Sequence, residues 1–307
     1  MKKIFMAVIA MMMTVSVSAQ FYIYLSNGSV LQADSISLVA PSTSSGDGIL
    51  SGEFSVSATE KVHFSQGNLQ ATYNGSNWTW SFATNQYDYI GDAAANTAIN
   101  GNGSVSTNGT VDLFGWSTAT TYFGIHNSTD YYLYSGDFVD WGTNAITNGG
   151  NKANLWRTLT KYEWVYLFYT RANAATLFGL GSVNGVNGTI LLPDNWILPE
   201  GASFTASTTQ GLADQGSYYY DENNGHFTDN TYTREQWSVM EDNGAVFLPA
   251  AGSRIGTDVD GVGSNGRYWS ATPYYPYYAC GLNFSSGGLD PQDFDNRGSG
   301  RSVRLVR

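Results

Sequence analysis

Short apolar segments separated by closely spaced turn residues are the feature that most restricts how this chain folds. The sequence contains 35 glycines, and Asn-Gly and Ser-Gly pairs interrupt segments such as 61–64 and 78–82, in which apolar and polar residues alternate. Alternation with a period of two places neighbouring side chains on opposite faces of a strand, and Gly and Asn adopt the backbone conformations of tight turns. The pattern predicts a fold built largely from short strands and hairpins.

Two helix-start signals interrupt this strand pattern. Thr160 with Glu163, and Thr233 with Gln236, have the spacing of a capping box, in which each side chain bonds the other residue's backbone amide. Apolar residues follow each box at spacings of three and four. Because the helices interrupt the strands rather than alternate with them, the predicted class is α+β, with two helices packed on a mixed or antiparallel sheet. The strands expected near the end of the chain are 245–248, 268–272, 280–284 and 302–306.

Residues 1–19 are organised like a secretory signal peptide. Lys2 and Lys3 precede an apolar run over 4–13, and small residues end at Ala19. The run is too short to cross a bilayer as a helix, so we expect cleavage before Gln20 and export of the remainder. No cysteine lies near that position and no later apolar run is long enough for an anchor. We therefore expect a protein at the cell surface or outside the cell that is neither a lipoprotein nor inserted directly in the membrane.

The mature chain divides into three parts by its local pattern. Two apolar runs at 21–25 and 30–38 flank an Asn-Gly pair, which predicts an N-terminal β-hairpin segment over 20–40. A stretch rich in Ser, Thr, Gly and Pro over 41–52 predicts a linker. The main domain is then expected over 53–307.

The charge balance excludes some partners. The formal net charge is −11, and it becomes 12 − 25 = −13 when the signal peptide and its two lysines are removed. Nucleic acids and anionic membranes bind through clustered Lys and Arg side chains, so neither is an expected partner. Aromatic residues make up 15% of the chain, which supplies enough apolar surface for a packed core.

Cysteine usage restricts how the fold is held together. Cys280 is the only cysteine, so an intrachain disulfide is excluded and packing must stabilise the domain. No activating residue is evident beside it in the sequence. We expect Cys280 to be a buried small apolar residue on a strand rather than a reactive thiol.

Signals for catalysis or metal binding are sparse. The three histidines do not have the spacing of metal ligands, and the sequence contains no Gly-x-Ser-x-Gly elbow. Each histidine is expected to be structural. Residues 261–266 match Gly-x-Gly-x-x-Gly, but a strand follows instead of the helix that a dinucleotide site needs, so a turn is predicted. Residues 258–261 lack the closing Glu of an EF-hand. No enzyme activity, cofactor or metal is expected, although a pair of carboxylates that meets only in the fold stays open.

Several ordered blocks carry a family resemblance. Phe-Ser-Gln-Gly-Asn-Leu-Gln stands at 64–70, Leu-Leu-Pro-Asp-Asn-Trp at 191–196 and Tyr-Trp-Ser-Ala-Thr at 268–272. Further blocks occupy 112–116, 156–160, 163–164, 244–252 and 301–307. In these blocks residues 53–307 resemble a large group of Bacteroidetes exported proteins. That group is similar to the C-type lectin-like fold, which is shared with formylglycine-generating enzymes and with the variable proteins of diversity-generating retroelements.

The resemblance implies where a ligand binds. In the variable proteins the diversified segment lies between a Trp-containing strand and a terminal Arg-rich strand, and the corresponding stretch here is 272–298. Of its 27 residues, 15 are Tyr, Ser, Gly, Asn or Asp, a bias also seen in antibody paratopes. A glycine-rich surface loop has the same composition. The residues expected to contact a ligand are Tyr274, Tyr275, Tyr277, Tyr278, Asn283, Asp290, Asp293, Asp295 and Asn296.

The same resemblance excludes two family activities. The cysteine pair that binds copper in formylglycine-generating enzymes cannot be formed by Cys280 alone. The Glu-Pro-Asn-like and Trp-Asn-Asp triplets of calcium-dependent lectins are also absent. The implied function is an exported binding protein, an adhesin or receptor with an extracellular protein or glycan ligand.

Two alternatives remain open from the sequence. The chain can instead be a structural subunit of a surface assembly, such as a pilus tip or stalk, that docks through the 21–38 hairpin by strand addition. Arg297, Arg301, Arg304 and Arg307 can capture an acidic ligand, but we expect them on the solvent side of the last strand, paired with nearby Asp residues.

Overall fold

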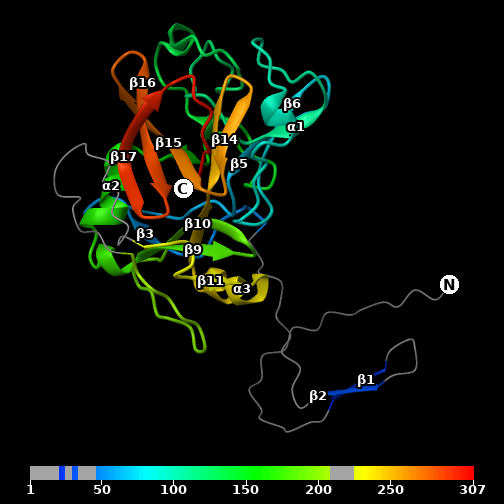
Figure 1. Ribbon diagram of the computed structural model, residues 1–307, viewed down its shortest axis with the longest axis vertical. Helices are drawn as coiled ribbons and strands as arrows, with labels where there is room; N and C mark the ends of the chain where they lie inside the picture. The colour runs from blue at the N-terminus through cyan, green and yellow to red at the C-terminus, as the bar shows by residue number, and fades with distance from the viewer. Residues whose placement is uncertain (1–20, 25–29, 34–45, 208–224) are drawn as a thin grey trace. The chain divides into compact units, whose positions relative to one another are not determined.

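The computed structural model describes residues 21–24, 30–33, 46–207 and 225–307, which fall into two units, Met1–Pro41 and Ser42–Arg307 (Figure 1). In the first unit β1 (Phe21–Tyr24) pairs antiparallel with β2 (Val30–Ala33), with Phe21 opposite Ala33. The expected signal peptide over 1–19, the hairpin turn and residues 34–40 lie outside the described residues.

A five-stranded sheet organises the second unit. Its order is β14-β13-β15-β16-β17, and it is antiparallel except where Gly252 of β13 pairs parallel with Gly266 of β15. The two longest antiparallel pairs join β15, β16 and β17 (Figure 1). The strands are β13 (Ala251–Ile255), β14 (Asp258–Val262), β15 (Asn265–Tyr274), β16 (Tyr278–Ser285) and β17 (Gly288–Asn296).

Smaller sheets surround this one. A four-stranded sheet has the order β11-β9-β10-β12, a three-stranded sheet has the order β6-β5-β7, and β3 pairs with β4 and β18 with β8. Their bounds are β3 (Phe54–Ser55), β4 (Lys61–Val62), β5 (Leu69–Tyr73), β6 (Trp78–Phe82), β7 (Gly109–Val111), β8 (Arg157–Thr158), β9 (Phe178–Val183), β10 (Val186–Leu191), β11 (Thr231–Tyr232), β12 (Val246–Pro249) and β18 (Leu305–Val306).

Both predicted capping boxes are confirmed. The Thr160 amide donates to Glu163 Oε2 at 2.6 Å, and Thr233 with Gln236 makes the equivalent reciprocal pair. The helix that follows Thr160, α2, contacts β15, β16 and β17, and the class is α+β, as predicted. The helical segments are α1 (Ala94–Thr97), α2 (Lys161–Val165), which continues as the π-helical η3 (Tyr166–Thr170), α3 (Arg234–Asp242), and the 3₁₀ turns η1 (Tyr131–Tyr134), η2 (Trp141–Thr143) and η4 (Ala174–Thr176).

Strand β15 lies between two apolar clusters. Tyr268 belongs to the cluster that contains Trp164 of α2, whereas the next residue, Trp269, belongs to the cluster that contains Trp116. Neighbouring strand residues point to opposite faces, so the sequence Tyr-Trp places one large ring in each cluster. Both polar atoms are satisfied, because Tyr268 Oη donates to the Pro249 carbonyl at 2.8 Å and Trp269 Nε1 to the Phe114 carbonyl at 2.7 Å. The central strand is therefore buried on both faces.

The segment with the Gly-x-Gly-x-x-Gly spacing is the end of β14, a turn and the start of β15, so the predicted turn is confirmed. Gly266 has a structural reason to be glycine. A Cβ added there would overlap the ring of Phe284, which is fully buried on β16.

We predict that Gly266→Ala lowers the free energy of unfolding by about 2 kcal/mol or more, because overpacking a closed core forces side chains and backbone to move. Gly46→Ala is the matched control, since an added Cβ there has no atom within 4 Å, and a change below about 0.5 kcal/mol is expected. Urea denaturation of both variants measures the difference. Equal effects of the two substitutions would contradict the packing argument.

Candidate functional site

The connection between β15 and β16 carries the predicted tyrosines, and we call residues 274–278 the tyrosine turn. Tyr274 pairs with Tyr278 across the two strands, and Tyr275 stands at the tip with 72% of its surface exposed. Tyr275 has a φ of 56°, a left-handed conformation that is costly for a bulky residue. Such strain persists only where the surrounding contacts impose it, and it is frequent at binding sites.

A phenylalanine joins these tyrosines. The Phe294 ring of β17 lies 4.3 Å from the ring of Tyr274 and 6.0 Å from that of Tyr278, and Phe294 is 45% exposed. Phe294 is not among the residues predicted from the sequence, although its polar neighbours Asp293 and Asp295 are. Its alternation with Asp293 and Asp295 on a strand is the signal that places it on the opposite face from the acids.

A second group of rings comes from a distant part of the chain. The rings of Tyr131 and Tyr132 in η1 lie 4.7 and 4.8 Å from that of Tyr277, and 4.6 Å from each other. Tyr132 is 57% exposed. The η1 turn is not among the elements predicted from the sequence, although Asp130 before a run of aromatic residues is a recognisable N-cap. Its carboxylate accepts from the Tyr132 amide at 3.0 Å.

Arg297 connects the two groups of rings. Its guanidinium donates to the carbonyls of Tyr275 and Tyr278 in the tyrosine turn, and to those of Tyr134 and Gly136 at the end of η1, at 3.1–3.3 Å. The same group lies 4.0 Å from the ring of Trp116. Arg297 is only 4% exposed, so its charge fixes backbone positions from beneath the surface.

The expectation that the terminal arginines face solvent is wrong for three of the four. Arg297, Arg301 and Arg304 are 4%, 1% and 1% exposed. The last segment is not an edge strand, because its backbone bonds Phe114, Trp269 and Leu69 on more than one side. Burial lowers the pKa of Arg304 to about 10, and its Nη2 donates to Gln86 Oε1 at 2.8 Å. Arg307 stays partly exposed and pairs with Asp47 at 2.9 Å.

The acids of the predicted site are divided between two places. Asp293 and Asp295 both accept from Arg301 Nη2, at 3.0 and 2.8 Å, so the expected Arg–Asp pairing does occur. Burial acts to raise the pKa of Asp295, but the charge and hydrogen bond of Arg301, the Asn296 amide and the charge of Arg267 together outweigh it, and the pKa is lowered. Both carboxylates are therefore already bound within the protein.

Asn283 and Asp290 lie towards the other end of the β16–β17 pair, opposite each other and away from the tyrosine turn. Asp290 is only 6% exposed, and its Oδ1 accepts from the Gln292 amide at 2.9 Å. Asn296 lies beside the tyrosine turn, opposite Tyr278, and accepts from the Gly298 amide at 2.8 Å. The structure therefore brings together the tyrosines, Phe294 and Asn296, but not Asn283 or Asp290.

The three histidines bond to different segments. His63 Nδ1 lies 3.2 Å from the Leu50 carbonyl, His126 Nδ1 accepts from the Ser128 amide at 3.0 Å, and His226 Nδ1 lies 3.1 Å from Ser286 Oγ. Within the described ranges no cluster of three or more His, Cys, Asp or Glu side chains has the arrangement of a metal site. Cys280 is 1% exposed, as predicted, and burial raises its pKa.

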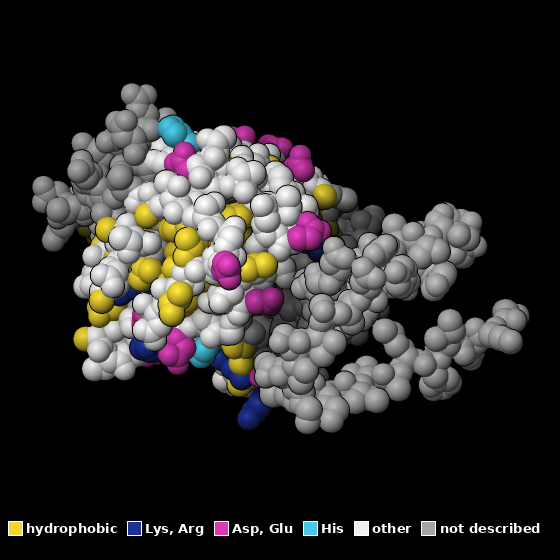
Figure 2. Space-filling view, turned by 90° about the horizontal axis from the view of Figure 1, so that it is seen from below, with side chains coloured by type: hydrophobic (Ala, Val, Ile, Leu, Met, Phe, Trp, Pro, Cys, Tyr) yellow, Lys and Arg dark blue, Asp and Glu magenta, His cyan; other side chains and the backbone are white. Residues whose placement is uncertain are grey.

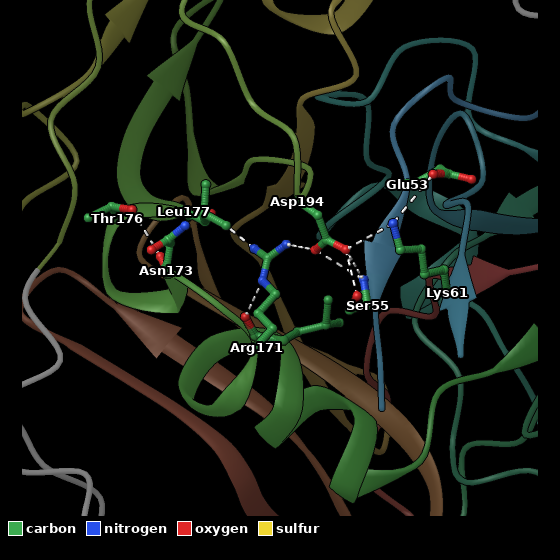
Figure 3. Close-up of polar contacts among 9 residues, drawn as sticks. Glu53, Ser55, Lys61, Arg171, Asn173, Thr176, Leu177 and Asp194 are labelled. Carbon is green, nitrogen blue, oxygen red and sulfur yellow. Dashed lines mark hydrogen bonds and ion pairs between the residues drawn. The ribbon is translucent and has the colours of Figure 1, made fainter. Parts of the chain in front are cut away.

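A charge network centred on the buried Arg171 ties three segments together (Figure 3). Asp194, which follows β10, accepts from the amide and hydroxyl of Ser55 at 3.0 and 2.6 Å and pairs with Arg171 at 3.3 Å. Lys61 lies 3.6 Å from both Asp194 and Glu53. Arg171 also donates to the carbonyls of Leu167 and Leu177. All three guanidinium nitrogens of Arg171 are hydrogen-bonded. The network joins β3, η3 and the segment after β10, so we assign it a structural role.

A separate small pocket of about 150 Å³ lies beside α3. Its lining is mixed: Glu200, Gly201, Ala202, Ser203, Thr231, Tyr232, Gln236 and Val239. Acidic side chains are spread over the face drawn in Figure 2, in keeping with the net charge of −11. The helices of the described segments are all too short or too polar to cross a membrane.

Comparison with known proteins gives one partial match. A family model described as a domain of unknown function (DUF8237) matches residues 217–306, less than a third of the chain. This region includes α3, the five-stranded sheet and the tyrosine turn. No curated protein and no solved structure matches the chain.

We predict that Asp194→Asn lowers the free energy of unfolding by about 3 kcal/mol, because it leaves the buried Arg171 charge without its counter-ion. Burial acts to raise the Asp194 pKa, but the Ser55 hydrogen bonds and Arg171 outweigh it and lower the pKa below 3.8. The wild-type advantage should therefore persist at neutral pH and disappear only as the pH falls through the lowered pKa. Thermal unfolding from pH 2 to 7 tests this, with the exposed Asp258→Asn as control.

Asp290 should show the opposite pH dependence. Burial, aided by the charge of Asp293, raises its pKa from 3.8 to about 6. An acid with a raised pKa stabilises the fold below its unfolded pKa and loses that contribution as the pH rises to about 6. We predict that Asp290→Asn is more stable than wild type at pH 8 and that this gain shrinks towards pH 4. A melting-temperature difference that is constant across this range would disprove the assignment.

Proposed function

We propose that this chain is an exported ligand-binding protein of the adhesin or receptor type, with its binding surface around the tyrosine turn. The observation that carries the proposal is the set of exposed rings at one end of β15, β16 and β17: Tyr275 at 72%, Phe294 at 45% and Tyr278 at 40%. A patch of large aromatic side chains exposed to solvent often marks a site that a partner covers. Aromatic anchors also dominate the binding energy of known interfaces.

The proposed domain type is C-type lectin-like, as the resemblance of residues 53–307 implies. Support comes from the placement of the resembling blocks: residues 268–270 are buried at the centre of β15, and the terminal block pairs with β8 through Leu305 and Val306. The segment between these blocks forms β16, β17 and their connections, which are buried in part and expose Tyr275, Tyr278 and Phe294. A variable protein of a diversity-generating retroelement needs this arrangement, in which a fixed frame holds a surface that tolerates substitution.

Binding rather than catalysis suits the chemistry of this surface. The nearby acids of β17, Asp293 and Asp295, are already paired with Arg301, and the rings on the opposite face of the strand supply contact area and hydroxyl groups. Tyr gives large area at a small cost in side-chain entropy, which is why paratopes are rich in it. The proposal requires export of the chain and a ligand that is an extracellular protein or glycan.

A structural subunit of a surface assembly is the second candidate. The observation that favours it is the β1–β2 pair, four residues in each strand, which forms a unit separate from Ser42–Arg307. A two-stranded hairpin is marginally stable in water by itself and gains stability from addition to another sheet. Deleting residues 21–38 separates the candidates: loss of surface display with intact ligand binding assigns assembly to the hairpin alone.

We predict that changing Tyr274, Tyr275, Tyr277 and Tyr278 to Ala abolishes ligand binding by a protein that remains folded. The measurement is a screen of purified residues 20–307 and of the variant against glycan arrays and intact cells, with near-UV circular dichroism as the folding check. Equal binding by both proteins would move the site elsewhere. Binding by neither would favour the structural subunit.

A further inference from the structure

This inference rests on the proposed function and concerns the extent of the site and the chemistry of its ligand. The side chains of Tyr131 and Tyr277 both interact with that of Tyr132, and this interaction raises the pKa of Tyr131. Burial is the largest cause that raises the pKa of Tyr277, and the interaction with Tyr132 is the next. Three tyrosine rings therefore meet at one point on the surface, with centroids 4.6–4.8 Å apart.

Charge limits what this surface can hold. In residues 128–138 and 272–298 the only basic side chain is Arg297, and it is buried with its donors on four carbonyls. The acids Asp130 and Asp137 are exposed at the margin. A sulfated, phosphorylated or sialylated ligand would meet the charges of Asp130 and Asp137, and these two segments offer it no exposed basic side chain.

The rings have the chemistry that a saccharide needs. In the same two segments, the exposed large apolar side chains without a hydroxyl are Leu133 and Phe294, so most of the exposed rings carry a hydroxyl group. A sugar ring presents weakly positive C–H groups to the negative face of an aromatic ring, while its hydroxyl groups bond to phenol oxygens.

We propose that the binding surface is composite, formed by Tyr131 and Tyr132 of η1 together with the tyrosine turn and Phe294, and that it binds a neutral saccharide chain. Arg297 is the positioning residue of this surface. It holds the carbonyl of Tyr275, whose φ of 56° is strained, and the carbonyls at the end of η1, so both groups of rings keep one relative position. Pre-organisation of this kind lowers the entropy cost of binding.

The test uses the mature chain on a printed array of neutral, sialylated and sulfated oligosaccharides, followed by titration calorimetry with the best neutral hit. The double variant Tyr131→Ala/Tyr132→Ala should weaken binding at least tenfold. Tyr132→Phe keeps the ring and removes the hydroxyl group of Tyr132, and it should weaken binding severalfold without loss of the fold. Tyr162→Ala on α2 is the control, because Tyr162 is 71% exposed and Tyr275 is 72% exposed. The Tyr162→Ala variant should bind the saccharide as tightly as the unmodified protein.

Arg297→Lys supplies a separate readout of the positioning role. Lysine cannot reach four carbonyls, so binding should weaken while the saccharide preference stays the same, and the entropy of binding should become less favourable. A change in preference instead of affinity would show direct contact and overturn the positioning role.

The outcomes separate this inference from the proposed function. Neutral-saccharide binding that Tyr131→Ala/Tyr132→Ala leaves intact and the Tyr274–Tyr278 substitutions remove would overturn the composite site alone. Binding only to anionic saccharides, or only to proteins on cells, would overturn the ligand class and leave the proposed function standing. An absence of binding to every array member and every cell type would overturn both.

Discussion

Burial of the arginine-bearing end of the chain is the constraint on which the rest of the structure depends. Residues 297–306 run between segments from both halves of the domain, and their backbone bonds Phe114, Arg254 and Trp269. Guanidinium groups cannot leave water without partners. Each buried arginine therefore fixes groups around it: Arg297 four carbonyls, Arg301 two carboxylates, and Arg304 the side chains of Asn68 and Gln86.

The candidate surface follows from this internal framework. Arg297 ties the tyrosine turn to η1 from beneath, and Arg301 draws Asp293 and Asp295 to one face of β17, which leaves Phe294 on the other beside Tyr274. Rigid support under an exposed aromatic surface allows its side chains to vary while the backbone stays fixed. The strained tip at Tyr275 is the visible sign of that support.

The candidate site could be predicted from the sequence only in part. The resemblance pointed to 272–298, and the four tyrosines around Pro276 are too close together in a short segment for all of them to be buried. The sequence could not show that Tyr131 and Tyr132 join Tyr277, since the two segments are far apart in the chain and meet only through the fold. For the same reason Asp290 was placed with the tyrosines, although strand pairing carries it to the opposite end of the hairpin.

Local patterns by themselves determined the α+β class, both capping boxes, the Gly261–Gly266 turn and the buried Cys280, because each depends on neighbours within a few residues or on apolarity alone. Tertiary structure decided which charges are inside. A cluster of arginines at the end of an acidic chain predicts a solvent-exposed strand face. The packing of the surrounding segments shows instead that Arg301 and Arg304 are buried. Burial is a property of what packs around a residue, and those segments are distant in sequence.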